Sequence, residues 1–211
     1  MLTMAVYQPD FLALTSALFF VYLGFLIPFN YIPLYAETHG TTSGAANVLL
    51  AMCYTGSVIG RISTGWAADR LGGFNILAVA SILSGILILY WVEVSATDAM
   101  TPFAYGLSSG GLIPLGAICV TQISPDMKHI GLRISAMMAL CSVGVIGGGP
   151  LSGFLLDSAA RRPTGYLAVF VFSGVATLVG GIFLVVVRLV WGSRTEMMYE
   201  ENGYSRKTRQ D

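Results

Sequence analysis

The chain has 211 residues, of which 55% are hydrophobic and only 10% are charged, and its 11 basic and 11 acidic side chains leave no net charge. Because soluble domains carry about a quarter charged residues, this composition excludes a water-soluble globule. The apolar residues form stretches of about 20, the length that a helix needs to cross a hydrocarbon core of about 30 Å.

Six membrane-spanning helices separated by short polar turns are predicted, at 11–36, 45–67, 74–94, 100–123, 132–156 and 165–191. The predicted fold class is an all-α membrane protein, with residues 1–191 as one transmembrane domain and residues 192–211 as a mobile polar tail. The sequence lacks the alternating strands of about ten residues that a membrane β-barrel needs. The first ten residues contain no lysine or arginine, unlike a cleavable signal sequence, so the first span is expected to remain in the mature protein.

Two prolines, Pro28 and Pro33, interrupt the outer part of the first span and bracket Asn30 and Tyr31. A proline has no backbone N–H and clashes with the preceding turn, so it frees carbonyl groups inside a helix. Transporters use such broken helices around their substrates. The alternative is a kink that only shapes helix packing, and the sequence leaves both interpretations open.

The second span carries a polar stripe, because polar residues recur there at intervals of 7, 3, 4 and 3 and share one face of a helix with 3.6 residues per turn. The stripe consists of Asn47, Tyr54, Ser57, Arg61 and Thr64. Such a stripe turns away from lipid, toward other helices or a water-filled cavity. Arg61 lies eight residues before Asp69, about 12 Å along the axis, so we expect it to face a cavity. The alternative is a structural arginine that snorkels or pairs with a neighbour, although snorkelling opposes the N-terminal tilt of helical side chains.

Basic residues gather at one side of the predicted helices. Of the ten lysines and arginines other than Arg61, eight lie near the second and fourth turns or the C-terminal end, and only Arg161 and Arg162 lie elsewhere. Positive residues favour the cytoplasmic side of a membrane. Both termini are therefore expected in the cytoplasm.

In the fourth span, Tyr105 and Ser109 share a face and are candidate hydrogen-bonding partners of a ligand, although a helical serine often bonds a carbonyl of the preceding turn. The GxSxG string at 106–110 resembles that of serine nucleophiles. Both histidines, His39 and His129, lie in predicted turns, so no base is within reach and the protein is not expected to be an enzyme. The glycine-rich segment 144–153 of the fifth span predicts close helix packing, with a hinge at its proline as a second interpretation.

The three cysteines, Cys53, Cys119 and Cys141, fall within spans and are expected to act as small apolar side chains. No disulfide, metal site, cofactor or nucleic-acid partner is expected. Every acidic residue lies at or beyond a span end, whereas proton relays in membranes use embedded carboxylates or histidines. Proton symport would therefore need a titrating group from outside this chain.

The segment GWAADRLG at 65–72 has the pattern GxxxDRxG and resembles the signature loop of the major facilitator superfamily, which occurs once in each six-helix half. Three further segments resemble the C-terminal half of fungal monocarboxylate-transporter-like proteins: GFLIPFNYIPLYA at 24–36, YGLSSGGLIPL at 105–115 and IGLRISAMMALCSVGVIGGGPLSG at 130–153. The resemblance covers residues 10–191 in order. It implies that the six helices form one half, a 3+3 inverted repeat, of a major facilitator fold, and that the plasma membrane is the expected location.

The resemblance also implies roles for the residues of the loop motif. Gly65 and Gly72 would permit a close helix approach and a tight reversal, while Asp69 and Arg70 would form a latch at the cytoplasmic side. The helix that faces this loop would belong to the other half of the transporter. The alternative for the two charged residues is an ordinary solvated turn.

Arg61 aligns with the arginine that pairs with the substrate carboxylate in animal monocarboxylate transporters, a role that suits the planar fork of a guanidinium group. Those relatives have an aspartate one helical turn earlier, where this chain has Ser57. The substrate class of those transporters therefore cannot simply be assigned to this chain.

The leading hypothesis is secondary-active transport of a small, monocarboxylate-like organic anion by alternating access. The expected substrate contacts are Arg61, Ser57, Tyr54, Asn30, Tyr105 and Ser109. The alternative is a truncated, transport-incompetent membrane protein that acts only by associating with a partner, because a lone half exposes its cavity wall to lipid. Besides the bilayer and the anion, the expected partner is a separate N-terminal half or a second copy of the chain. The start of the chain at the edge of the first span, without a basic segment, favours truncation.

Overall fold

The computed structural model describes residues 9–91, 98–124, 129–159 and 165–207, and all regular structure in these ranges is helical. The helices are α2 (Pro9–Phe25), α3 (Ile27–Thr38), α4 (Ser43–Leu71), α5 (Gly73–Trp91), α6 (Met100–Ser109), α7 (Leu112–Ile123), α8 (Ile130–Ala159) and α9 (Gly165–Lys207). They make six helices long and apolar enough to cross a membrane, because α2 with α3 and α6 with α7 each form one span. The predicted all-α class with six spans is confirmed.

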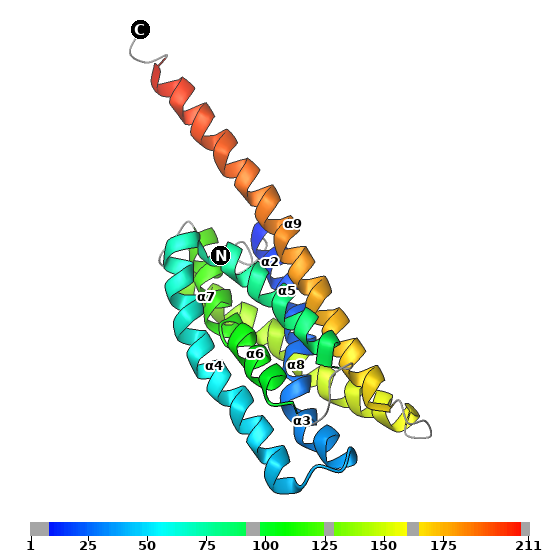
Figure 1. Ribbon diagram of the computed structural model, residues 1–211. Helices are drawn as coiled ribbons and strands as arrows, with labels where there is room; N and C mark the ends of the chain where they lie inside the picture. The colour runs from blue at the N-terminus through cyan, green and yellow to red at the C-terminus, as the bar shows by residue number, and fades with distance from the viewer. Residues whose placement is uncertain (1–8, 92–97, 125–128, 160–164, 208–211) are drawn as a thin grey trace.

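The helices form one bundle in which elements distant in sequence lie side by side (Figure 1). α9 packs along both α5 and α2, α4 packs along α6, and α8 packs along α2. α3 contacts both α4 and α8. The start of α2 and the extension of α9 lie at the same end of the bundle, as an even number of spans requires.

The last helix is longer than predicted. The sequence places the end of the sixth span at residue 191 and a mobile tail after it, whereas the backbone of α9 continues as a helix through Lys207 and projects beyond the bundle (Figure 1). Hydropathy marks where a helix leaves the membrane, but the helix itself continues wherever residues of good helix propensity follow, and this segment contains no proline.

The first span breaks at Leu26, between α2 and α3, because Pro28 has no N–H to offer the carbonyl of Gly24 one turn earlier. That carbonyl is not left open. The Ser173 hydroxyl of α9 donates a 2.7 Å hydrogen bond to it. The interruption expected from the sequence is present, and at Gly24 it serves helix packing.

The fourth span bends at Gly110 and Gly111, between α6 and α7, where Pro114 likewise removes a backbone donor. The break is local, because the N–H of Gly110 donates to the Gly106 carbonyl at 2.9 Å and the N–H of Leu115 donates to the Gly111 carbonyl at 3.0 Å. The two halves of the span therefore stay nearly continuous.

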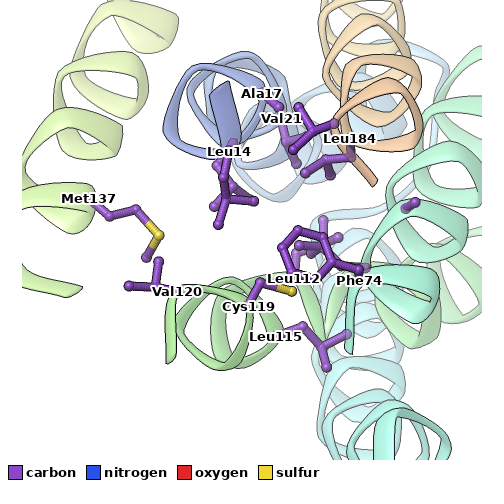
Figure 2. Packing of buried hydrophobic residues seen from close by; sticks show 14 of the residues in the cluster. Leu14, Ala17, Val21, Phe74, Leu112, Leu115, Cys119, Val120, Met137 and Leu184 are labelled. Carbon is purple, nitrogen blue, oxygen red and sulfur yellow. The ribbon is translucent and has the colours of Figure 1, made fainter. Parts of the chain in front are cut away.

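Two apolar clusters hold the bundle together. The larger joins α2, α5, α7, α8 and α9, and Figure 2 shows Met137 of α8 directed toward Val120 of α7, with Phe74 of α5 beside Leu112 of α7. The smaller includes residues of α3, and in it the Trp91 ring stacks on Phe170 with centroids 6.0 Å apart. Cys53, Cys119 and Cys141 are buried and free in these clusters.

Glycines set the close approach of α4 to α6. A Cβ atom added to Gly106 would collide with the carbonyl of Cys53, and one added to Gly60 would collide with the carbonyl of Leu107. Gly56 and Gly110 face backbone in the same way. Small residues four apart on both helices let the two backbones touch, which is how helices associate in lipid.

Two spans remain far less covered than the others. Only 33% of the apolar window in α4 and 22% of that in α8 is buried, against 50% to 61% in the other four spans. Both helices therefore present long faces that no other part of the described chain covers.

Candidate functional site

The candidate site is the exposed edge of α4. Asn47, Tyr54 and Arg61 are all exposed, and intervals of seven residues place them on one line, about 10 Å apart along the axis. The nearest acidic residue on α4 is Asp69, eight residues beyond Arg61. Arg61 thus lies within a candidate membrane span, on a face that the described part of the chain leaves open.

The other two members of the predicted stripe turn inward. Ser57 is only 6% exposed, and its backbone carbonyl lies against Gly110 of α6. Thr64 is half-buried, and its hydroxyl donates to the carbonyl of Gly60 at 2.6 Å. The stripe is therefore split along its length into an open edge and an edge that packs on Gly110 and Gly111 of the fourth span.

Aromatic rings connect the open edge to α3. The Phe29 ring lies 5.6 Å from the Tyr54 ring and 5.5 Å from the Tyr105 ring, measured between centroids. Asn30 follows Phe29 and is exposed, and the Tyr54 side chain is 54% exposed. The structure thus brings Tyr54 and the segment that carries Asn30 together, with Phe29 between them.

Two predicted contacts lie in the interior instead. Tyr105 has no exposed surface, and its hydroxyl donates to the carbonyl of Phe25, which the break between α2 and α3 leaves without its usual helical donor. Ser109 is 1% exposed and donates to the Gly106 carbonyl at 3.4 Å. Both hydroxyls are occupied within the bundle, so neither lines the exposed edge of α4.

The loop motif lies at the end of α4. Gly72 has a φ of 90°, as a tight reversal into α5 requires, and its N–H donates to the carbonyl of Ala68 at 2.9 Å. The Arg70 guanidinium lies 4.3 Å from the centre of the Trp66 ring. Asp69 is exposed. A Cβ atom added to Gly65 would meet nothing within 4 Å, so the close approach expected at this glycine involves nothing in the described chain.

The glycine-rich segment of α8 packs on α2 through one face only. Cβ atoms added to Gly144 or Gly148 would press on the carbonyls of Phe19 or Leu23, whereas Gly147 and Gly149 face open space. On the same helix the Ser152 hydroxyl donates to the Tyr31 hydroxyl at 3.2 Å. The predicted close packing is present, and the opposite face of α8 stays uncovered.

Sequence reasoning missed three features of this region. Phe29 connects Tyr54 and Tyr105, yet an isolated aromatic residue in an apolar span carries no signal. The paired small residues Gly56 and Gly60 had a usable signal in their spacing of four. Arg133 was counted among the basic residues of a turn, but it is 5% exposed and donates to the Ser124 hydroxyl at 3.2 Å.

Within the described ranges, no group of three metal-ligating side chains comes together. The chemistry available at the exposed edge of α4 is therefore that of one cation, one phenol and amide groups. These groups suit the recognition of an anion.

Comparison with known proteins identifies relatives along almost the whole chain. Residues 14–202 match the Major Facilitator Superfamily. The chain is 38% identical over 186 residues to the MFS-type transporter pynF of Aspergillus niger. The match covers 87% of this chain and 42% of that protein.

Two further relatives have names that describe export. The aspyridones efflux protein apdF of Emericella nidulans is 31% identical over 185 residues, covering 87% of this chain and 37% of that protein. The agnestins efflux protein AgnL12 of Paecilomyces divaricatus is 31% identical over 184 residues, covering 86% of this chain and 41% of that protein. The chain thus spans less than half the length of these relatives.

Proposed function

The chain belongs to the Major Facilitator Superfamily, and we propose that it forms the C-terminal half of a transporter that moves a small organic anion by alternating access. A role in membrane transport, rather than in catalysis, follows from the family and from the named transporters among its relatives. The anion, the mechanism and the status as a C-terminal half are the proposal.

The observation that carries the proposal is the exposed position of Arg61 within a span, about 12 Å from Asp69 near the end of α4. An arginine in a membrane span needs water or a partner, because an isolated charge in hydrocarbon is costly by a few kcal/mol or more. On the same line of α4, Tyr54 and Asn47 supply further polar groups. A wall of this kind is expected where two parallel halves enclose a central cavity.

The substrate that fits this wall best carries a carboxylate or a similar planar anion. A guanidinium group binds such a group through two parallel hydrogen bonds, and the neighbouring rings of Tyr54 and Phe29 offer an aromatic surface. A monocarboxylate-like anion with an apolar body meets both requirements. The names of two relatives favour export as the direction of transport.

The uncovered faces of α4 and α8 support a second half as partner, supplied either by a separate N-terminal half or by a second copy of this chain. In that assembly both termini lie in the cytoplasm, most naturally at the plasma membrane, and Asp69 with Arg70 latches the cytoplasmic side. The alternative function is a transport-incompetent membrane protein that acts only through such association. The same uncovered faces support it, since they need a cover whether or not anything is transported.

The test uses a transport-competent assembly that contains this chain. We expect Arg61→Lys to raise the substrate concentration needed for half-maximal transport at least tenfold, about 1.4 kcal/mol of binding, because an ammonium group replaces two parallel hydrogen bonds with a point charge. Thr64→Ala is the matched control on the same helix, since its hydroxyl is occupied by Gly60. Equal, small effects of the two substitutions would remove Arg61 from the substrate site.

A further inference from the structure

A concave apolar surface lies beside α4. A groove of about 500 Å³ opens between α4, α5 and α6. Its longest wall is one face of α5, from Ile76 to Leu87, which extends about 16 Å along the helix axis. The groove is therefore elongated along the direction in which the helices cross the membrane.

The groove lies on a different face of α4 from Arg61, although Thr64 of the polar stripe lines its edge. Ser63 lines the groove and lies two residues after Arg61. Two residues on an α-helix turn the side chain by about 200°, so the two side chains point nearly opposite ways. Arg61 is not among the residues that line the groove.

The groove offers an occupant no free hydrogen-bond donor from its hydroxyl groups. Ser63 donates to the carbonyl of Gly60 at 3.2 Å, and Thr64 donates to the same carbonyl at 2.6 Å. Ser108 donates to the Tyr105 carbonyl at 3.0 Å and accepts from the Ser84 hydroxyl at 3.0 Å. The rest of the lining is aliphatic, so a hydrocarbon is the occupant that loses nothing on entering.

The length of the groove suits an extended hydrocarbon chain, which can lie along the lining of α5 and needs no hydrogen-bonding partner there. Exposed Val79, Leu83 and Ile86 leave the groove open to the bilayer along its length.

The end of the groove near the end of α4 carries a cation. Arg70 lies three residues after the lining residue Ala67, on nearly the same face and about 4.5 Å further along the axis. Its guanidinium group lies 4.3 Å from the centre of the Trp66 ring, and both side chains are exposed. Tryptophan and arginine are the residues that meet lipid headgroups at a membrane interface.

We propose that this groove holds one acyl chain of a bilayer phospholipid whose headgroup phosphate contacts Arg70. The apolar lining holds the chain, and the cation favours an anionic headgroup over a zwitterionic one. The bound lipid thereby fills the space between α4 and α5, on the outer side of the helix that carries Arg61. The site is independent of the identity of the transported molecule.

The first test counts phospholipids bound to the full chain after gentle detergent extraction, by native mass spectrometry. We expect one retained phospholipid per chain, enriched in anionic headgroups. Ala104→Phe, which fills the groove, should reduce the retained fraction at least fivefold, and Arg70→Gln should abolish the anionic enrichment. Ala139→Phe on the exposed face of α8 is the matched control and should change neither value. A chain that retains no lipid, or an Ala104→Phe variant that retains as much as the wild type, overturns the proposal.

A second test needs no groove-filling variant. In a Trp91→Phe/Trp191→Phe background, brominated phosphatidylglycerol is titrated into the detergent-solubilised chain while the fluorescence of Trp66 is recorded. We expect quenching that saturates at one lipid per chain and that brominated detergent does not reproduce. Quenching that rises linearly without saturation, or that a brominated zwitterionic lipid reproduces at equal concentration, contradicts the site.

Discussion

Single residues at the start of α6 show how a carboxylate outside the membrane stabilises a helix. Asp98 accepts hydrogen bonds from the Thr101 hydroxyl at 2.5 Å and from the backbone N–H groups of Thr101 and Met100, both at 3.2 Å. These bonds, the Thr101 hydroxyl first, favour the ionised carboxylate and lower the pKa of Asp98 below its ordinary value. The carboxylate thus acts as the cap for the first turn.

The expected consequence is a pH-dependent loss of stability. A lowered pKa in the folded state means that Asp98 stabilises the fold above its unfolded pKa of about 4, and that this contribution disappears as the pH falls through the folded pKa. Asp98→Ala should lower the free energy of unfolding at pH 7 by about 0.5 kcal/mol, the low end for a cap, because solvent screens the site. Thermal unfolding in detergent at pH 7 and pH 3 measures the effect. An equal difference between variant and wild type at both pH values would contradict it.

At the same scale, the sequence predicted the helices on which polar residues lie better than it predicted the hydrogen-bond partners of their side chains. Arg61 and Tyr54 are exposed on α4, and the substrate cavity that they are predicted to face stays a prediction. Tyr105 was predicted on the correct helix, but its hydroxyl meets the carbonyl of Phe25, 80 residues away in the chain. No periodicity within one span reveals a carbonyl that another span leaves without a donor.

At the scale of helices, the contact between α4 and α6 depends on backbones that touch. Gly106→Ala adds a Cβ atom that collides with the carbonyl of Cys53, so the two helices must separate. Overpacking of this kind costs about 1 to 3 kcal/mol. The midpoint of thermal unfolding in detergent should fall accordingly.

The matched control for this substitution is Gly147→Ala in α8. It makes the same chemical change in a transmembrane helix, at a glycine where an added Cβ atom meets nothing within 4 Å. The midpoint of thermal unfolding should therefore not change. Comparable losses in the two variants would show that the cost comes from the residue type rather than from the helix contact.

Helix positions were predictable because hydropathy and length respond to the same physical limit, the thickness of the bilayer. All six predicted spans have counterparts in the structure. The break at Leu26 was indicated by Pro28, but its function was not, since Ser173 of α9 decides whether the freed carbonyl is available. The extension of α9 through Lys207 was missed, because a hydropathy pattern ends where the membrane ends.

For the whole molecule, the unequal burial of the six spans is the observation that bears most directly on assembly with a partner. α4 and α8 are the least buried spans, and each has one face packed and one face open. The open face of α4 mixes Arg61 with large apolar side chains such as Ile62 and Trp66, which are 72% and 61% exposed. Lipid alone covers the apolar part of such a face well and the charged part poorly, which favours a proteinaceous partner along the Arg61 edge.

Gly65 offers a way to separate assembly from folding, because it continues that edge one turn beyond Arg61 and has nothing within 4 Å of an added Cβ. Gly65→Leu should leave the thermal midpoint of this chain unchanged. In a transport-competent assembly it should reduce transport at least tenfold, because the leucine fills the space that a helix of the partner half needs. Gly44→Leu, at an open glycine near the other end of α4 and on a different face, is the control and should leave transport intact. Full transport by the Gly65→Leu assembly would place the partner elsewhere, since a packed helix cannot accommodate four extra carbon atoms without separating from its neighbour.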